Sequence, residues 1–299
     1  MRQVEWLREE RYAEADKKGR QHFHIQPSAG SLKKPAGFVY HDGLYHLFYE
    51  WLPARGLKYW YHISSPDLIR FVTHGPVVIM SDSDERDCKM EQKWDDGFDF
   101  DAPQLTQGPE GEQILVGWIG GSEPCFTVPR LISIEEGKTR QRPHPLLERL
   151  RGEPETAEGY AMKHDIRLHP YEGDCYELII DILENESTEF YIELRVSRRE
   201  ATRLIYNHAA RKFTLDRFDS GLLTTNSQDF TRSVILETPL QKIHAFVDQT
   251  SIEIFLNDGE KVMTSRIFPS DSATGIRTST ESGQVYLKFT KYDIEKQDV

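Results

Sequence analysis

The sequence predicts an all-β protein with two domains. From residue 22 onward, short runs rich in aromatic and β-branched residues follow one another, separated by turn residues. Two Asp-Gly pairs, Asp42-Gly43 and Asp258-Gly259, lie between such runs and are typical of tight hairpins. Residues 143–152 carry two prolines and a short helical pattern, which divides the chain near its middle. Many short strands of this kind favour a propeller, a barrel or a sandwich.

The elements of the first half are expected in the following order. Residues 1–21 form a helix, because apolar residues recur there at loose helical spacing among charges. Residues 22–143 form the first β domain, which opens with a hairpin over residues 37–51. Its further strands are expected at residues 59–64, 72–80, 113–119, 126–134 and 139–141.

The second half is expected to be a β-sandwich. Residues 144–159 are taken as a linker, and β-type segments dominate again over residues 160–299. Polar and apolar residues alternate in Ser251–Leu256, immediately before the turn at Asp258-Gly259. Such alternation is typical of a strand with one face in a core, which favours two packed sheets.

Composition excludes several classes of function. A net charge of −12 argues against nucleic acid or an anionic membrane as partner, because both require a basic face. The charged N-terminus shows no signal peptide and no apolar run is long enough to span a bilayer, so the cytoplasm is the expected location. Three widely separated cysteines form no disulfide framework. His22 and His24 have a spacing compatible with metal but no convincing third ligand, so neither a metal nor a cofactor is expected.

Several motifs carry a family resemblance. Residues 20–53 include the stretch Gly-Ser-Leu-Lys-Lys-Pro-Ala-Gly, and residues 94–104 include Asp-Phe-Asp-Ala-Pro-Gln. These segments are similar to the Gly-Trp-Met-Asn-Asp-Pro-Asn-Gly and Asp-Phe-Tyr-Ala-Pro-Gln motifs of the β-fructosidases of glycoside hydrolase family 32. Further collinear similarity covers residues 59–68, 114–120, 128–130, 246–248 and 251–268. The resemblance implies a five-bladed propeller, a C-terminal sandwich and activity on fructosides.

The resemblance also shows what the chain lacks. Lys34 stands where the family has its catalytic nucleophile, an aspartate, and a lysine cannot act as a carboxylate nucleophile. Residues 81–93 alone separate the two matching blocks, although the family has its acid/base motifs and further blades there. Residues 22–143 are long enough for about two blades, whereas closed propellers have at least four. We therefore expect an abbreviated propeller whose ring is completed by a homo-oligomer.

Other carboxylates are candidates for a relocated catalytic role. Asp87 lies in Arg-Asp-Cys-Lys, which echoes the family's Arg-Asp-Pro-Lys, although an ordinary charged linker would look the same. Asp99 and Asp101 lie two apart on an expected strand, so their side chains should share one face. Paired carboxylates are what glycoside hydrolysis requires. Alternatively, this acidic cluster is a solvated blade edge or a partner of Lys33 and Lys34.

Candidate binding residues follow from the same positions. Trp60 and Trp118 stand where the resemblance implies tryptophans facing the sugar, although burial in a core or an interface is equally compatible with them. Glu50 replaces a substrate-contacting glutamine, Asp101 replaces the motif's tyrosine, and Lys34 would suit an anionic ligand such as a sugar phosphate.

Three functions remain open from the sequence. The chain is an inactive β-fructosidase relative retained for saccharide binding or regulation, an active glycosidase with relocated carboxylates, or an assembly module with no saccharide role. Release of fructose from sucrose, sucrose 6-phosphate or fructans separates the second from the others, and saccharide binding separates the first from the third.

Overall fold

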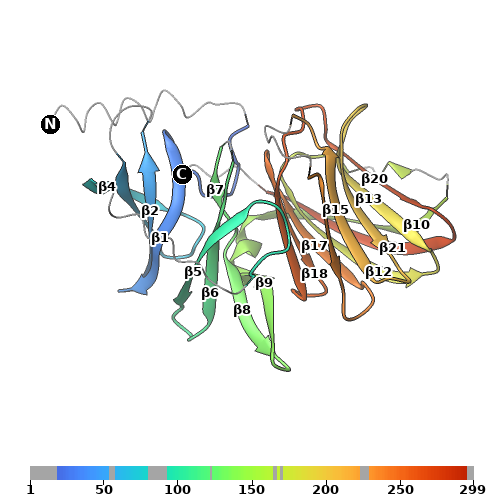
Figure 1. Cartoon of the computed structure of the whole chain (residues 1–299), viewed down its shortest axis with the longest axis horizontal. Helices are drawn as coiled ribbons and strands as arrows, with labels where there is room; N and C mark the ends of the chain where they lie inside the picture. The colour runs from blue at the N-terminus through green and yellow to red at the C-terminus, as the bar shows by residue number, and fades with distance from the viewer. Residues whose placement is uncertain are drawn as a thin grey trace.

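The computed structural model describes residues 19–53, 58–79, 93–121, 123–163, 167–168, 171–222 and 229–294. This part of the chain forms four antiparallel sheets (Figure 1). Two of them, here called blade I and blade II, lie side by side at the N-terminal end, and the other two form a sandwich. The predicted helix of residues 1–21 falls almost entirely outside the described residues. Within the described residues, no helix has the length and apolar character needed to cross a membrane.

Blade I is a four-stranded sheet built on the predicted hairpin. Its strands, in spatial order, are β1 (Ser31–His41), β2 (Leu44–Leu52), β3 (Tyr59–Ser65) and β4 (Val72–Ile79). Asp42 and Gly43 both have positive φ (48° and 80°), as a tight two-residue hairpin turn requires. Burial alternates along β2, and its buried aromatic residues, such as Tyr49, pack with Phe126 of blade II.

Blade II repeats this plan. Its strands are β5 (Phe100–Gln107), β6 (Gln113–Ile119), β8 (Arg130–Glu135) and β9 (Lys138–Pro143) in that order, and β7 (Cys125–Phe126) pairs with β6. The first strands of the two blades, β1 and β5, are in contact, and the Tyr40 N–H donates to Thr106 Oγ1 between them (3.0 Å). The described residues up to Pro143 thus contain two blades, one of four strands and one of four strands plus the short β7, which confirms the abbreviated propeller.

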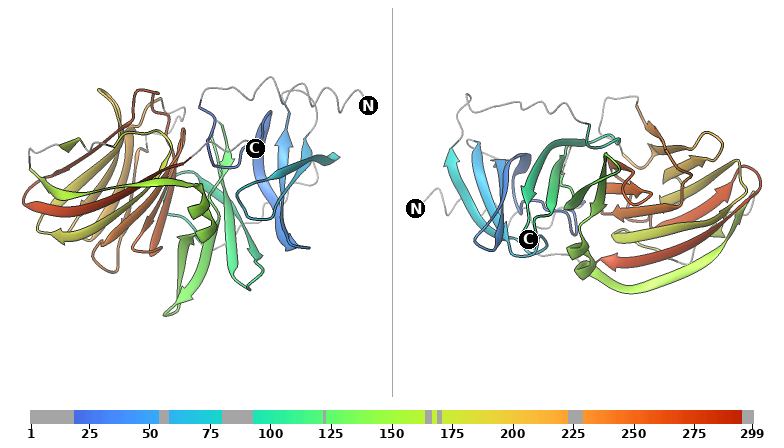
Figure 2. Two further views of the ribbon diagram at one scale, coloured as in Figure 1. Left: turned by 180° about the vertical axis from the view of Figure 1, so that it is seen from behind. Right: turned by 90° about the horizontal axis from the view of Figure 1, so that it is seen from below.

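The sandwich consists of two six-stranded sheets, which Figure 2 shows from two further sides. One sheet has the order β10 (Arg151–Met162), β21 (Gln284–Ile294), β12 (Tyr176–Asn185), β17 (Lys242–Val247), β18 (Ser251–Leu256) and β19 (Lys261–Arg266). The other has the order β11 (Arg167–Leu168), β20 (Gly275–Thr280), β13 (Glu189–Val196), β14 (Ala201–Asn207), β15 (Lys212–Asp219) and β16 (Thr231–Ile235). Apolar side chains of both sheets, such as Ile180 and Phe190, form one buried core.

The connector between the domains is shorter than the predicted linker of residues 144–159. It contains the 3₁₀ helix η2 (Pro145–Leu150), whose first turn is capped by the His144 side chain. From Arg151 onward the chain is already β10, which pairs with β21 and so belongs to the sandwich. This segment resembles a linker because Gly, Pro and Glu are rare in central strands, but β10 is an edge strand and tolerates them.

A buried ionic interface joins blade II to the sandwich. Arg130 on β8 contacts Glu253 on β18 (Nη2–Oε2 2.6 Å) and Asp95 in the loop before β5 (Nη1–Oδ2 3.0 Å), and none of these side chains is more than 1% exposed. The same loop crosses β19 so closely that a Cβ on Gly97 would lie 2.2 Å from the Thr264 carbonyl oxygen. The two domains therefore pack against each other without an intervening gap.

Candidate functional site

The predicted nucleophile position lies where the two blades meet. Lys34 on β1 forms an ion pair with Asp101 on β5, with Nζ and Oδ2 3.1 Å apart. The Lys34 and Asp101 side chains are 48% and 54% exposed, so the pair is open to solvent. The alternative in which the acidic cluster partners a lysine is confirmed for Asp101. The pair places a cation where the family resemblance implies a nucleophilic carboxylate.

Five of the predicted site residues form a continuous row across neighbouring strands. Asp101 is the register partner of Trp118 on β6, and its ion pair with Lys34 leads to β1. Lys33 and Lys34 lie in an irregular section of β1 between Leu32, which pairs with Trp51, and Pro35, which pairs with Tyr49. Glu50 is the β2 residue between these two partners. It is in turn the register partner of Trp60 on β3. The row therefore runs Trp118, Asp101, Lys34, Glu50, Trp60, and is here called the site row.

Each carboxylate in the site row has a lysine partner. Glu50 contacts Lys58 (Oε1–Nζ 3.1 Å), as Asp101 contacts Lys34. The Trp118 indole N–H is buried and has no hydrogen-bond partner among the described residues. An unpaired buried donor costs about 1–3 kcal/mol, so such groups are commonly satisfied by water or a ligand. The row thus combines two aromatic residues, two ion pairs and one unused donor.

Asp99 and Asp101 have different partners in the structure, and a shared face for their side chains stays a prediction. Asp99 precedes β5, and its Oδ2 accepts from Arg217 Nη1 (2.6 Å) and from the Arg266 N–H (2.7 Å), both in the sandwich. Burial lowers the pKa of Arg217, but its contact with Asp99 counteracts this. Asp99 thus contacts the sandwich, whereas Asp101 contacts Lys34 of blade I. A catalytic role for Asp99 stays a prediction, as does that of Asp87, which lies outside the described residues.

His24 lies in the interdomain interface. Its Nδ1 is 2.8 Å from Asp248 Oδ2 and its Nε2 is 3.0 Å from Glu253 Oε1, with all three side chains fully buried. Burial alone would lower the pKa of His24, but these two hydrogen bonds and charges outweigh it and raise the pKa to about 9. The His22 N–H also donates to Asp248 (2.7 Å). Among the described residues no cluster of three or more His, Cys, Asp or Glu side chains could hold a metal ion.

Sequence reasoning missed this ionic interface, although the signal was present. Arg130 and Asp248 fall in two short segments, residues 128–130 and 246–248, that carry the family resemblance. Charged residues in such matching segments are candidates for a shared structural network. Their partners could not be named from the sequence, because Arg130 and Glu253 lie 123 positions apart and His24 and Asp248 lie 224 positions apart.

Comparisons with known families agree with this architecture. Residues 146–295 match "Glycosyl hydrolases family 32 C terminal", and residues 24–90 match "Glycosyl hydrolases family 32 N-terminal domain". The sucrose-6-phosphate hydrolase of Staphylococcus xylosus is 54% identical over 212 residues, which cover 67% of this chain and 43% of that protein. A probable sucrose-6-phosphate hydrolase of Vibrio cholerae is 32% identical over 197 residues, 62% of this chain and 34% of that protein. The chain thus spans less than half the length of these curated relatives.

Solved structures share the fold. The sucrose-6-phosphate hydrolase of Lactobacillus gasseri superposes with a TM-score of 0.80 at 17% identity, covering 98% of this chain and 96% of that one. The exo-inulinase of Aspergillus awamori gives a TM-score of 0.78 at 14% identity, covering 94% and 99% of the two chains. Together with the family matches over both domains, these results show that the chain belongs to glycosyl hydrolase family 32.

Proposed function

We propose that this chain is a catalytically inactive relative of the β-fructosidases that binds a fructose-containing saccharide or sugar phosphate along the site row. The Lys34–Asp101 ion pair carries the proposal. A retaining glycosidase needs two carboxyl groups about 5–5.5 Å apart, one of them held protonated as a general acid. Here a cation occupies the nucleophile position, and its partner Asp101 is 54% exposed, which is too open for the dry environment of a general acid.

Saccharide binding is supported by the aromatic and polar content of the site row. Tryptophan faces and a few hydrogen-bonding groups are common features of sugar sites. Trp118 has an unused buried donor, and Lys34 and Lys58 could attract an anionic group. Two structural relatives were solved with fructose-containing sugars, a silkworm β-fructofuranosidase variant with sucrose and a chicory fructan exohydrolase variant with 1-kestose. We include a cytoplasmic location in the proposal, since the described cysteines, Cys125 and Cys175, are free and buried.

The protein should release no fructose from sucrose, sucrose 6-phosphate, inulin or levan, and Lys34→Asp should not restore release. The substitution supplies one carboxylate but no general acid, so the rate should stay at the uncatalysed background. The measurement is chromatographic quantification of fructose after prolonged incubation. The double variant Lys34→Asp/Asp101→Asn is the matched control, because it removes the adjacent carboxyl group.

Either of two outcomes would overturn this proposal. Fructose release by the wild-type protein would show an active glycosidase, and release by Lys34→Asp that is lost in the double variant would show that Asp101 can serve as the second carboxyl group. Isothermal titration calorimetry with the same sugars separates saccharide binding from a purely assembling role. Detectable heat that is reduced in Trp118→Phe supports binding at the site row, whereas no heat with any of the sugars contradicts it.

The same proposal includes a homo-oligomer in which two copies contribute two blades each. A propeller ring needs at least four blades, and each chain has two in its described part. The outer strand β4 leaves Val72 and Val77 more than half exposed, and Val39 on β1 is 46% exposed. Exposed sheet edges and apolar faces favour association.

Light scattering coupled to size-exclusion chromatography should therefore give a mass of about twice that of one 34.8 kDa chain. Replacing Val72 and Val77 together with lysine should shift the protein toward the monomer, because charged side chains on an edge strand oppose pairing. Ile134→Lys is the control, since Ile134 is 77% exposed on the β8–β9 hairpin of blade II. A stable, folded wild-type monomer at micromolar concentration would rule out this assembly.

A further inference from the structure

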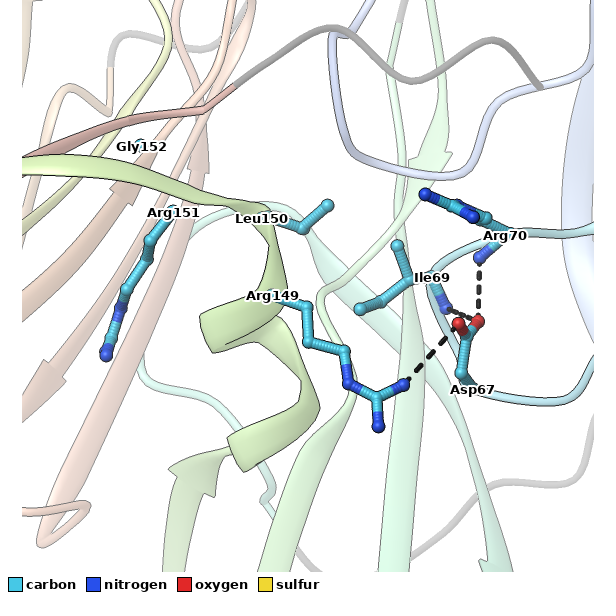
Figure 3. Close-up of a pocket in the computed structure, with 7 residues that line it drawn as sticks. All are labelled: Asp67, Ile69, Arg70, Arg149, Leu150, Arg151 and Gly152. Carbon is cyan, nitrogen blue, oxygen red and sulfur yellow. Dashed lines mark hydrogen bonds and ion pairs between the residues drawn. The ribbon is translucent and has the colours of Figure 1, made fainter.

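A cavity of about 350 Å³ lies between blade I and the connector (Figure 3). One wall comes from the loop after β3, with Asp67, Ile69 and Arg70, and the other comes from the end of η2 and the start of β10, residues 149–152. No residue of the site row lines the cavity. It is therefore distinct from the proposed saccharide site.

One oxygen of the carboxylate in this cavity, Oδ1 of Asp67, is already hydrogen-bonded by the loop itself. Asp67 Oδ1 accepts from the backbone N–H groups of Ile69 (3.1 Å) and Arg70 (3.0 Å) and from the Ser65 hydroxyl (3.1 Å). Partial burial alone would raise the pKa of Asp67, but these hydrogen bonds outweigh it and lower the pKa. Asp67 therefore holds the loop in shape as an anion through Oδ1, while its Oδ2 faces the Arg149 guanidinium without a hydrogen bond.

Two arginines present unused donors to the cavity. Arg149 approaches Asp67 only at 3.7 Å, which is an ion pair but too long for a hydrogen bond. The Arg70 guanidinium has no hydrogen bond or ion pair with any other described residue and extends toward Leu150 (Figure 3). Arg151 is different, because its guanidinium points away from the cavity and contacts Glu177 (2.6 Å). Arg70 and Arg149 come from opposite walls of the cavity.

We propose that this cavity binds a small phosphate-bearing anion between Arg70 and Arg149. Guanidinium groups bind phosphate oxygens through paired, charge-assisted hydrogen bonds. A tetrahedral phosphate has acceptor oxygens in several directions and can bridge two guanidinium groups on opposite walls. A planar carboxylate instead pairs best with a single guanidinium group. The cavity volume is within the range of small-molecule sites.

Such a ligand would act on the domain arrangement. Ile69 beside Arg70 packs against the cluster that contains Leu147 and Leu150 of η2, so the cavity lies at a contact between blade I and the connector. A phosphate bound to Arg70 and Arg149 would link these two parts. Because a ligand that binds the folded state stabilises it, binding should raise the melting temperature.

The experiment uses the full chain with inorganic phosphate as the probe, at constant ionic strength adjusted with potassium chloride. In the wild-type protein, saturating phosphate should raise the melting temperature by about 2–4 °C. Arg70→Gln and Arg149→Gln should each weaken phosphate binding by about tenfold or more, because each removes a charge-assisted contact. Arg149→Lys, which keeps the charge but loses the planar fork, should bind with intermediate affinity.

Arg198→Gln is the matched control, since Arg198 is an exposed arginine in the turn between β13 and β14 of the sandwich. It should retain wild-type phosphate binding. The proposal is overturned if calorimetry detects no phosphate binding, or if phosphate raises the melting temperature equally in all of the variants, since that would be a general salt effect. The circular dichroism spectra of the Arg70 and Arg149 variants should match that of the wild-type protein, which shows that a loss of phosphate binding does not come from unfolding. This test is independent of the saccharide experiments, because neither arginine belongs to the site row.

Discussion

Arg130→Met is expected to lower the free energy of unfolding by about 3–5 kcal/mol. Arg130 is fully buried and is the cation between Glu253 and Asp95, with N–O distances of 2.6 and 3.0 Å. Methionine fills much of the same volume but leaves two buried carboxylates without this partner. Burial raises the pKa of Asp95 even with Arg130 present, so its carboxylate depends on this cation. Urea unfolding followed by fluorescence and by circular dichroism measures the loss.

Arg142→Met is the matched control for Arg130. Arg142 also pairs with a glutamate, Glu135, but both side chains lie on the surface of the β8–β9 hairpin and are 36% and 44% exposed. Exposed pairs contribute about 0–1 kcal/mol, so this variant should remain close to wild type. A loss below about 1 kcal/mol for Arg130→Met, or equal losses for the two variants, would contradict the interpretation of the interface as a buried and mutually dependent set of charges.

The stability of the protein should decrease as the pH rises from about 6.5 to about 9, by about 3 kcal/mol. His24 has its pKa raised to about 9 in the folded state, because its hydrogen bonds to Asp248 and Glu253 outweigh the effect of burial. The unfolded chain has an ordinary histidine pKa, so the stabilisation is complete below about pH 6.5 and is lost as the pH passes the folded value. Urea unfolding midpoints at intervals across this range give the profile.

His24→Gln should be less stable at neutral pH and should flatten this part of the profile, because the titrating group is gone. His41→Gln is the control, since His41 is an exposed histidine at the β1–β2 turn (73%) and should keep the wild-type slope. A wild-type profile that is flat between pH 6.5 and 9 would contradict a charged His24 in the interface. On the acid side, burial alone would raise the pKa of Asp248, but its hydrogen bond and charge interaction with His24 outweigh this and lower the pKa to about 2. The stabilisation that Asp248 contributes to the folded state should therefore be lost only as the pH falls below about 4.

The sequence was sufficient for features that depend on local chemistry. The Asp42-Gly43 and Asn257-Asp258-Gly259 segments adopt the positive φ values that tight hairpins need, so both turns were predictable from residue type. The distance between the matching blocks predicted two blades, and two blades are present among the described residues. Trp118, Asp101 and Lys34 could be named from motif positions, although the pairing of Lys34 with Asp101 needed the contact between β1 and β5.

Features that depend on distant packing were not predictable. The spacing of Asp99 and Asp101 does not reveal their partners, because the loop before β5 packs on β19, where the Phe98 N–H donates to the Thr264 carbonyl oxygen (2.8 Å). β10 has the composition of a linker, and only its pairing with β21 makes it a strand. Local sequence does not contain the information about which remote strand offers an unpaired edge.

The buried ionic interface determines how the chain can be dissected. Position 150, where η2 ends and β10 begins, looks like a convenient cut between modules. A fragment beginning there would retain Glu253 and Asp248 on the sandwich but lose their partners Arg130 and His24. The two carboxylates would then be exposed to solvent without a cation. The complementary fragment would carry His24 without Asp248 and Glu253, and Arg130 with Asp95 but without Glu253. The two modules are therefore interdependent in folding, and the boundary visible in the topology is not a boundary of autonomous units.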